Sequence, residues 1–244
     1  MMKTAIILAL LQIAMAANLP DKFKRCRVKD PEADSCLRVA LQDALQKIGN
    51  TGIPSLNMGP LEPLNVKEIK VDQGGHGPVT VRLQFNNLKI YGIPESSITS
   101  FQLSNYEIMA ESVTPVFKFE ADYVMDGQLL VLPVKGKGKC LIWLDNLITN
   151  HDIRGRPLTR GGDVYMDLQS YTIKMRTKRL HLNFKNLFNG DKTLGETMNS
   201  FMNENWDVIF TELRPSLERA FGNAFLEYAK VIFDQVPHND IFLQ

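Results

Sequence analysis

The stretch between Thr193 and Phe233 constrains the fold of this chain more than any other part of the sequence. Its apolar residues recur three or four positions apart, which places them on one face of an amphipathic helix. They are Phe201, Ile209, Leu213, Leu217, Phe221, Phe225, Tyr228 and Ile232. About 40 residues at about 1.5 Å each span roughly 60 Å, whereas a compact domain of this size has a radius of gyration near ~18 Å. We therefore expect an elongated protein or a long helix wrapped by other structure, unless the stretch is an ordinary core helix plus a short second one.

Two local signals bear on the ends and continuity of this helix. Thr193 and Glu196 have the spacing of a capping box, in which the threonine hydroxyl accepts a backbone N–H and the glutamate reaches back. Pro215 lies inside the run. Because proline lacks an N–H and restricts the residue before it, we expect a kink or a break near Leu213 or Arg214.

Residues 1–17 have the pattern of a secretory signal peptide. Lys3 precedes an apolar run over residues 6–11, and the small residues Ala14 and Ala16 suit a cleavage site. The run is too short to cross a bilayer, and no later stretch has the roughly 20 apolar residues that a spanning helix needs. We therefore expect a secreted, extracellular protein that does not span a membrane, with a mature chain that begins at Ala17 or Asn18.

The composition fits one globular domain without a charged partner. The chain has 28 Lys and Arg residues against 27 Asp and Glu residues, so neither nucleic acid nor an anionic membrane surface is an expected partner. No linker divides the sequence, and we expect residues 18–244 to form a single domain. We expect a monomer, and a receptor or protein partner stays unidentified.

The three cysteines carry information because the chain has a secretory start. Cys26 and Cys36 are close in sequence and lie in a polar segment, so we expect a local disulfide that ties the N-terminal arm to the first helix. Such a short loop is worth about 2–3 kcal/mol in the chain-entropy model. Cys140 lies in an apolar strand, where we expect an inert buried thiol.

The rest of the chain predicts one short helix followed by antiparallel sheet. Leu37 to Ile48 has helical spacing and is stopped by glycines. Apolar and polar residues then alternate over 79–86, 117–123 and 180–184, which is typical of strands with one wet face. We expect turns at Gly74-Gly75, Asp126-Gly127 and Gly161-Gly162, of which Asp126-Gly127 is the strongest hairpin signal.

The longest predicted strand runs from Gln128 to Asp145. One of its faces is apolar throughout and has Gly136 and Gly138 in the middle. Glycine in a strand marks a bend or a close approach by another backbone. The sheet and the C-terminal helix each present an apolar face, so we expect the two faces to bury each other. The seam between them either leaves an elongated apolar cavity or is filled by side chains.

No catalytic or metal site is evident in the sequence. There is no G-x-S-x-G nucleophile elbow, and no histidine has a partner at metal-ligand spacing. Of the four histidines, His76, His181 and His238 are interpreted as surface residues and His151 is given no role. The acidic residues are interpreted as solvated. We expect no enzymatic activity, no cofactor and no metal. A Ser or Cys within hydrogen-bond reach of one of these histidines, in a cleft, would favour a hydrolase instead.

The chain resembles the insect takeout and juvenile-hormone-binding proteins over essentially its whole length. The resemblance is carried by the secretory start, the Cys26–Cys36 pair, the strand 132–138 (LPVKGKG), the order of helices and strands, and the ending from Asn203-Glu204-Asn205-Trp206 through Leu213-Arg214-Pro215 to Phe233. The hormone-binding branch usually has a second disulfide. Cys140 has no partner here, so the chain looks like the takeout branch.

The resemblance implies an α+β fold. In it, a long, kinked C-terminal helix is wrapped by a highly curved antiparallel sheet, similar to half of a tubular lipid-binding protein, with a short N-terminal helix. It also implies an internal tunnel for a long apolar ligand and no enzymatic activity. The N-terminal helix of the hormone binders is described as a gate over the ligand, and Leu37 to Ile48 is the matching segment here.

We therefore expect a secreted carrier of a long hydrophobic small molecule, such as a terpenoid like juvenile hormone, a fatty-acyl lipid or a quinone-like lipid. The alternative is a secreted protein–protein interaction module whose tunnel is filled or vestigial. Inward-facing residues are expected to line the tunnel, with two glycines making room. They are Val81, Leu83, Phe85, Phe117, Phe119, Leu130, Leu132, Val134, Gly136, Gly138, Ile142, Phe201, Phe221 and Phe225.

Overall fold

The computed structural model describes residues 17–73 and 77–244. The predicted signal peptide, apart from Ala17, lies outside the described residues, and so do the predicted turn at Gly74-Gly75 and His76. Within the described ranges, no helix combines the length and the apolar character that crossing a membrane requires.

The elements follow one another as a short N-terminal helix, a run of strands and a set of C-terminal helices. The helices are α1 (Ala33–Ile48), α2 (Lys192–Glu204), α3 (Trp206–Phe233) and α4 (His238–Ile241), with 3-10 turns η1 (Pro54–Leu56) and η2 (Phe188–Gly190). The strands are β1 (Cys26–Arg27), β2 (Leu64–Gln73), β3 (Val79–Tyr91), β4 (Ser97–Ser104), β5 (Glu107–Leu129), β6 (Leu132–Arg160), β7 (Asp163–Arg176), β8 (Arg179–Phe184) and β9 (Phe242–Leu243).

A long hairpin, β5–β6, forms the centre of a seven-stranded antiparallel sheet in the described chain. Its flanking strands change along its length. On one side, β3 pairs with residues 118–129 of β5, and β4 pairs with residues 107–113. On the other side, β8 pairs with residues 140–145 of β6, and β7 pairs with residues 148–160. The change of partner lets the sheet curve strongly, since each half is flanked by its own strands.

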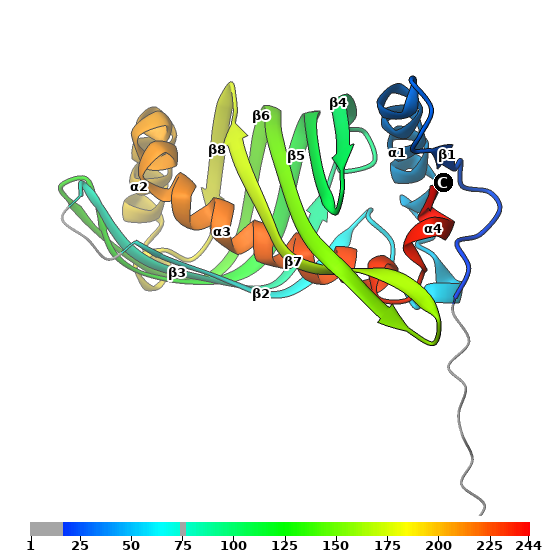
Figure 1. Cartoon of the computed structure of the whole chain (residues 1–244). Helices are drawn as coiled ribbons and strands as arrows, with labels where there is room; N and C mark the ends of the chain where they lie inside the picture. The colour runs from blue at the N-terminus through cyan, green and yellow to red at the C-terminus, as the bar shows by residue number, and fades with distance from the viewer. Residues whose placement is uncertain (1–16, 74–76) are drawn as a thin grey trace, which may run out of the picture.

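Helix α3 lies along the concave side of this sheet, with α2 at one end and α1 at the other (Figure 1). It has 28 residues, which at about 1.5 Å per residue is roughly 42 Å. Its buried residues include Ile209, Leu213 and Phe221, which pack in one core cluster with alternate residues of the sheet. The predicted α+β fold, a long helix wrapped by a curved antiparallel sheet, is confirmed.

The C-terminal helix is broken at Asn205 and not at the predicted position near Leu213 or Arg214. The Asn205 side chain donates to the Phe201 carbonyl at 2.8 Å, and its backbone N–H donates to the same oxygen at 3.1 Å, which satisfies the last turn of α2 and ends it. Pro215 sits inside α3 on its exposed side, where proline costs a backbone hydrogen bond but disturbs no packing.

Two further details of the sequence prediction were wrong. The N-cap of α2 is Asp191, whose carboxylate accepts from Leu194 N–H at 3.0 Å, and not Thr193. The β5–β6 turn falls at Leu130-Val131, between the paired residues Leu129 and Leu132, and not at Asp126-Gly127. Residues 126–127 lie inside β5, so the long strand β6 begins at Leu132 and continues beyond Asp145 to Arg160.

Three edge strands of the sheet, β8, β4 and β7, each contact a helix. Polar side chains of the helix form hydrogen bonds with backbone groups of the strand. At β8, Asn203 accepts from Leu182 N–H at 3.0 Å and donates to its carbonyl at 2.7 Å. Asn199, one helical turn earlier, makes the same pair of bonds to Phe184 at 2.8 and 2.9 Å. At β4, Gln42 of α1 accepts from Ile98 N–H at 2.8 Å. At β7, Glu218 of α3 accepts from Met175 N–H at 2.8 Å. These contacts fix where each helix docks.

The N-terminal arm and the C-terminal segment are joined beside α1. Strands β1 and β9 pair in parallel through Cys26 with Phe242 and Arg27 with Leu243. The expected disulfide between Cys26 and Cys36 is present, so β1 is linked covalently to α1. Helix α1 is therefore held at its N-terminal end by this bond and along its length by Gln42.

We expect the variants Asn199→Asp and Asn203→Asp each to lower the free energy of unfolding by about 1–3 kcal/mol. Each change keeps the size of the side chain but removes the donor and places a carboxylate against a strand carbonyl. Urea denaturation measures the loss. Glu204→Gln, on an exposed residue of the same helix, is the control and should stay within about 0.5 kcal/mol. Equal stabilities of all four proteins would contradict the role given to the two asparagines.

Candidate functional site

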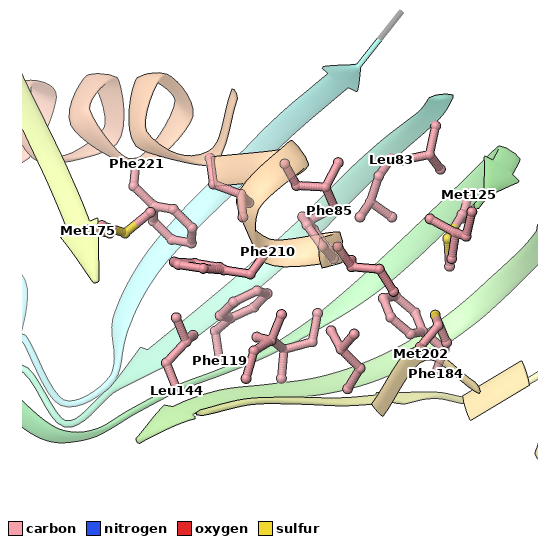
Figure 2. Close-up of a pocket in the computed structure, with 18 of the residues that line it drawn as sticks. Leu83, Phe85, Phe119, Met125, Leu144, Met175, Phe184, Met202, Phe210 and Phe221 are labelled. Carbon is pink, nitrogen blue, oxygen red and sulfur yellow. The ribbon is translucent and has the colours of Figure 1, made fainter. Parts of the chain in front are cut away.

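Two internal cavities lie between α3 and the concave face of the sheet. The small cavity has a volume of about 50 Å³ and is lined by α3 up to Phe221, by Met202 of α2 and by β3, β5, β6, β7 and β8. Figure 2 shows its walls, where Phe119 of β5 and Phe210 and Phe221 of α3 point towards one another. Its lining residues are all Val, Leu, Ile, Met or Phe, and these side chains nearly fill the space.

The large cavity has a volume of about 330 Å³ and lies at the other end of the sheet, under α1. Its walls are α1, strands β4 to β7 and the second half of α3. Several positions in these walls carry small side chains, which leave the space that larger residues fill in the small cavity. They include Ala40, Ala44, Ala110, Ala229, Ser96 and Ser112. The volume is at the lower end of the range for small-molecule sites.

A partition of three side chains separates the two cavities. Phe117, Met175 and Phe221 line both of them. The Phe117 and Phe221 rings meet edge to face with centroids 5.8 Å apart, a favourable aromatic geometry. The partition stands where β5 changes partner from β3 to β4. The two cavities therefore lie end to end along α3 and are separated by these three side chains.

One wall of the large cavity carries three polar side chains in hydrogen-bond contact, which we call the polar cluster. Ser112 of β5 and His151 of β6 meet through Oγ and Nε2 at 2.9 Å, and Tyr171 of β7 meets His151 through Oη and Nδ1 at 3.1 Å. Burial lowers the pKa of His151 to about 4 and raises the pKa of Tyr171. The imidazole is therefore neutral at neutral pH, and both rings face the cavity.

The structure corrects the sequence interpretation of the histidines and of one acidic residue. His151, which the sequence left without a role, lines the cavity inside the protein. His238 is only 8% exposed, between Tyr106 and Phe242, and is not a surface residue. Glu218 is 6% exposed, so the interpretation of the acidic residues as solvated is wrong for this one. The pattern could not show this, because inward and outward residues alternate with different phases in the two halves of β5 and β6.

Half of the predicted tunnel residues lie at the small cavity, and three line the large one. Val81, Leu83, Phe85, Phe117, Phe119, Ile142 and Phe221 line the small cavity. Phe117, Phe221 and Phe225 line the large cavity. Leu130, Leu132, Val134, Gly136, Gly138 and Phe201 line neither of these two cavities. Contact of any of these residues with a ligand stays a prediction.

The two strand glycines make room for protein and not for a cavity. A Cβ at Gly136 would lie 2.6 Å from Tyr123 Oη and 3.1 Å from Leu187 Cα, and one at Gly138 would lie 2.5 Å from Lys185 O. The predicted close approach of another backbone is therefore confirmed, and that backbone is the segment after β8. The expected burial of Cys140 is also confirmed, and burial raises the pKa of its thiol to about 12.

Sequence reasoning missed most of the large cavity. It singled out Phe117, Phe221 and Phe225 but neither the inner face of α1 nor the polar cluster. The signal that could have found the cavity is the concentration of alanine, serine and threonine at inward positions of α1, just before β4 and in the first half of β5, because small inward residues leave space.

The fold and the cavities define a class of protein in which a long helix and a curved sheet enclose apolar space for a ligand. The model of the haemolymph juvenile hormone binding protein (JHBP) family matches residues 5–243, and the chain belongs to this family.

Known proteins similar to this chain match it over most of their own length and most of its length. The circadian clock-controlled protein daywake of Drosophila melanogaster is 26% identical over 240 residues, which cover 95% of this chain and 91% of that protein. A putative beta-carotene-binding protein of Schistocerca gregaria is 21% identical over 216 residues, 87% of this chain and 84% of the relative. The crystal structure of Takeout 1 of Epiphyas postvittana superposes with a TM-score of 0.76 at 23% identity and covers 90% of this chain and 99% of its own. That likeness supports the fold.

We expect protonation of His151 to destabilise the protein in acid. The unfolded chain takes up this proton near pH 6.5, whereas the folded protein holds it off until about pH 4. Stability is therefore lost as the pH falls through this window, by about 3 kcal/mol from this group. In urea unfolding measured across the window, His151→Gln should lose less stability than the unsubstituted protein. His181→Gln, on a histidine paired with Asp145, is the control. Parallel curves for His151→Gln and the unsubstituted protein would show that the ring is not held neutral.

Proposed function

We propose that the protein is a secreted, monomeric carrier that encloses a hydrophobic small molecule in the large cavity and acts without covalent chemistry. The observation that carries the proposal is the cavity of about 330 Å³, whose walls are mainly apolar and whose cover is α1. Burial of apolar ligand surface supplies the affinity, at about 25 cal/mol per Å². The Cys26–Cys36 disulfide suits an extracellular location.

The ligand is proposed to be a terpenoid such as juvenile hormone, a fatty-acyl lipid or a quinone-like lipid. The family description names juvenile hormone, and the locust relative is named for β-carotene, an apolar terpenoid. The body of the ligand occupies the large cavity. A longer chain reaches the small cavity only if Phe117, Met175 and Phe221 move, because these side chains stand between the two.

The alternative, an interaction module with a filled tunnel, lacks support at the α1 end. A vestigial tunnel would be packed with side chains, as the small cavity nearly is, whereas small residues line the large cavity.

A hydrolase is a second candidate because Ser112 and His151 are in hydrogen-bond contact in a cavity. Three features weigh against it. The other nitrogen of His151 meets the Tyr171 hydroxyl and not a carboxylate, so no negative group stabilises an imidazolium. Burial lowers the pKa of His151 to about 4, which makes it a weak general base at neutral pH. Ser112 sits within a paired strand rather than on an exposed turn. Release of myristate from methyl myristate, abolished by Ser112→Ala, would favour the hydrolase.

The carrier proposal is tested by filling the large cavity. We expect Ala40→Phe to weaken binding of a fluorescent apolar probe, such as N-phenyl-1-naphthylamine, by about tenfold or more, because the added ring occupies space that the ligand needs. Val39→Phe is the matched control, since Val39 is the next residue of α1 and is 41% exposed. The protein is delipidated before titration.

The outcome that would overturn the proposal is equal probe binding by both variants, or no probe binding by the delipidated unsubstituted protein. Thermal unfolding of the three proteins shows whether either variant has lost its fold. Ala110→Phe places a ring on the opposite wall of the same cavity, in β5, and should have the same effect as Ala40→Phe if the space itself holds the ligand.

A further inference from the structure

We infer that Ser112, His151 and Tyr171 form a subsite for a neutral oxygen acceptor of the ligand, such as the carbonyl of an ester, a ketone or a quinone. The subsite disfavours a free carboxylate. The inference rests on the proposed carrier function and names the ligand chemistry that the large cavity selects. Its starting point is that three polar side chains, joined by two hydrogen bonds through His151, line a cavity that is otherwise largely apolar.

The three residues come from adjacent strands and share the concave face of the sheet. His151 of β6 stands between β5, where it pairs with Ala110, and β7, where it pairs with Ile173. Its two ring nitrogens are both engaged, one by Ser112 and one by Tyr171. The two hydroxyl groups are therefore the ends of the polar cluster, and the imidazole is its middle.

The hydrogens of the polar cluster do not balance internally. A neutral histidine has one N–H, and the two hydroxyl groups have one O–H each, which makes three donors for two hydrogen bonds. If Tyr171 donates to Nδ1, Nε2–H donates to Ser112 and the serine hydrogen is left over. If Nδ1–H donates to Tyr171, Ser112 donates to Nε2 and the tyrosine hydrogen is left over. In either tautomer one hydroxyl group at the cavity wall has a hydrogen for an acceptor outside the cluster.

The charge of the site favours a neutral acceptor. The lowered pKa of His151 leaves the imidazole uncharged at neutral pH. Among the described residues that line the cavity, the one cation is Lys24, which is exposed at the surface end. A carboxylate beside Ser112 would thus lose its hydration without a counter-charge, which costs far more than one hydrogen bond returns. A carbonyl oxygen loses less hydration and regains one hydrogen bond.

A second pair of hydroxyl groups in the cavity wall could also donate a hydrogen bond to the ligand, and the test has to distinguish it from the polar cluster. Ser96 and Thr114 meet at 2.7 Å, and both line the large cavity closer to α1. Two hydroxyl groups and one bond also leave one hydrogen over. This pair is therefore the competing site for an oxygen acceptor, because it presents the same chemistry in the same cavity at a different place.

The test is a displacement titration of N-phenyl-1-naphthylamine from delipidated protein by three ligands of similar chain length: 2-pentadecanone, myristic acid and tetradecane. The ketone is used because it cannot be hydrolysed. The proteins are the unsubstituted chain, the double variant Ser112→Ala/Tyr171→Phe and a comparison variant, Ser96→Ala/Thr114→Val, which removes both hydroxyl groups of the competing pair. The double variant is needed because either hydroxyl alone can still donate through the other tautomer. In the double variant the ring nitrogens of His151 lie about 3 Å from the positions of the lost oxygens.

We expect the double variant to bind the ketone about tenfold more weakly and tetradecane unchanged, because only the ketone loses a hydrogen bond. The comparison variant should keep the ratio of ketone to tetradecane affinity that the unsubstituted protein has. At neutral pH, myristic acid should bind the unsubstituted protein at least about tenfold more weakly than the ketone.

Three results would overturn the inference while leaving the carrier function intact. They are an unchanged ratio of ketone to tetradecane affinity in the double variant, a lowered ratio in the comparison variant instead, and myristic acid binding as tightly as the ketone. Failure of the probe and of all three ligands to bind the folded, unsubstituted protein would instead contradict the carrier function itself. Because tetradecane binding reports on the apolar cavity alone, it separates the two failures and shows that the double variant keeps its cavity.

Discussion

Burial of α3 against the concave face of the sheet is the interaction on which the rest of the structure depends. The helix places its apolar side chains in the same core cluster as alternate residues of β3, β5, β6, β7 and β8. A helix is a straight, rigid cylinder, and a twisted sheet can follow it closely only where the facing side chains are large. Around Phe221 the rings fill the gap. Towards α1 the inward residues become small, and the same packing arrangement leaves a cavity. The packing of α3 on the curved sheet therefore determines both the shape of the protein and the space for a ligand.

The edges of the sheet show how the helices are positioned. A free strand edge presents unpaired N–H and C=O groups that attract other chains. Here Asn199 and Asn203 of α2 act as a substitute strand for β8, and Gln42 and Glu218 do so at single positions of β4 and β7. Each helix thus has two functions, to cover apolar surface and to satisfy backbone groups. The directional bonds fix the register of the helix against the sheet, which apolar packing alone leaves loose.

The sequence predicted the parts of the fold that follow from periodicity. Alternation identified β3, β5 and β8, and the three-to-four spacing identified the long helix. It failed where a single residue decides. Asn205, not Pro215, ends the first helix, because a side chain satisfies the carbonyl there. Leu130 adopts a φ of 55°, which the sequence does not signal, so the turn was misplaced at Asp126-Gly127. The polar cluster was out of reach because its residues are 39 and 20 positions apart along the chain, and only the pairing register of β5, β6 and β7 brings them together.

The parallel pairing of β1 with β9 has a mechanical consequence. Tension applied between the N-terminal arm and the C-terminal segment is carried by two residue pairs arranged side by side, and the Cys26–Cys36 bond passes it directly to α1. The long hairpin β5–β6 lies outside this load path. A force applied to the two ends would therefore act on α1, the cover of the large cavity, before it acted on the sheet. Helix α1 can thus be displaced while the sheet wall of the cavity stays folded.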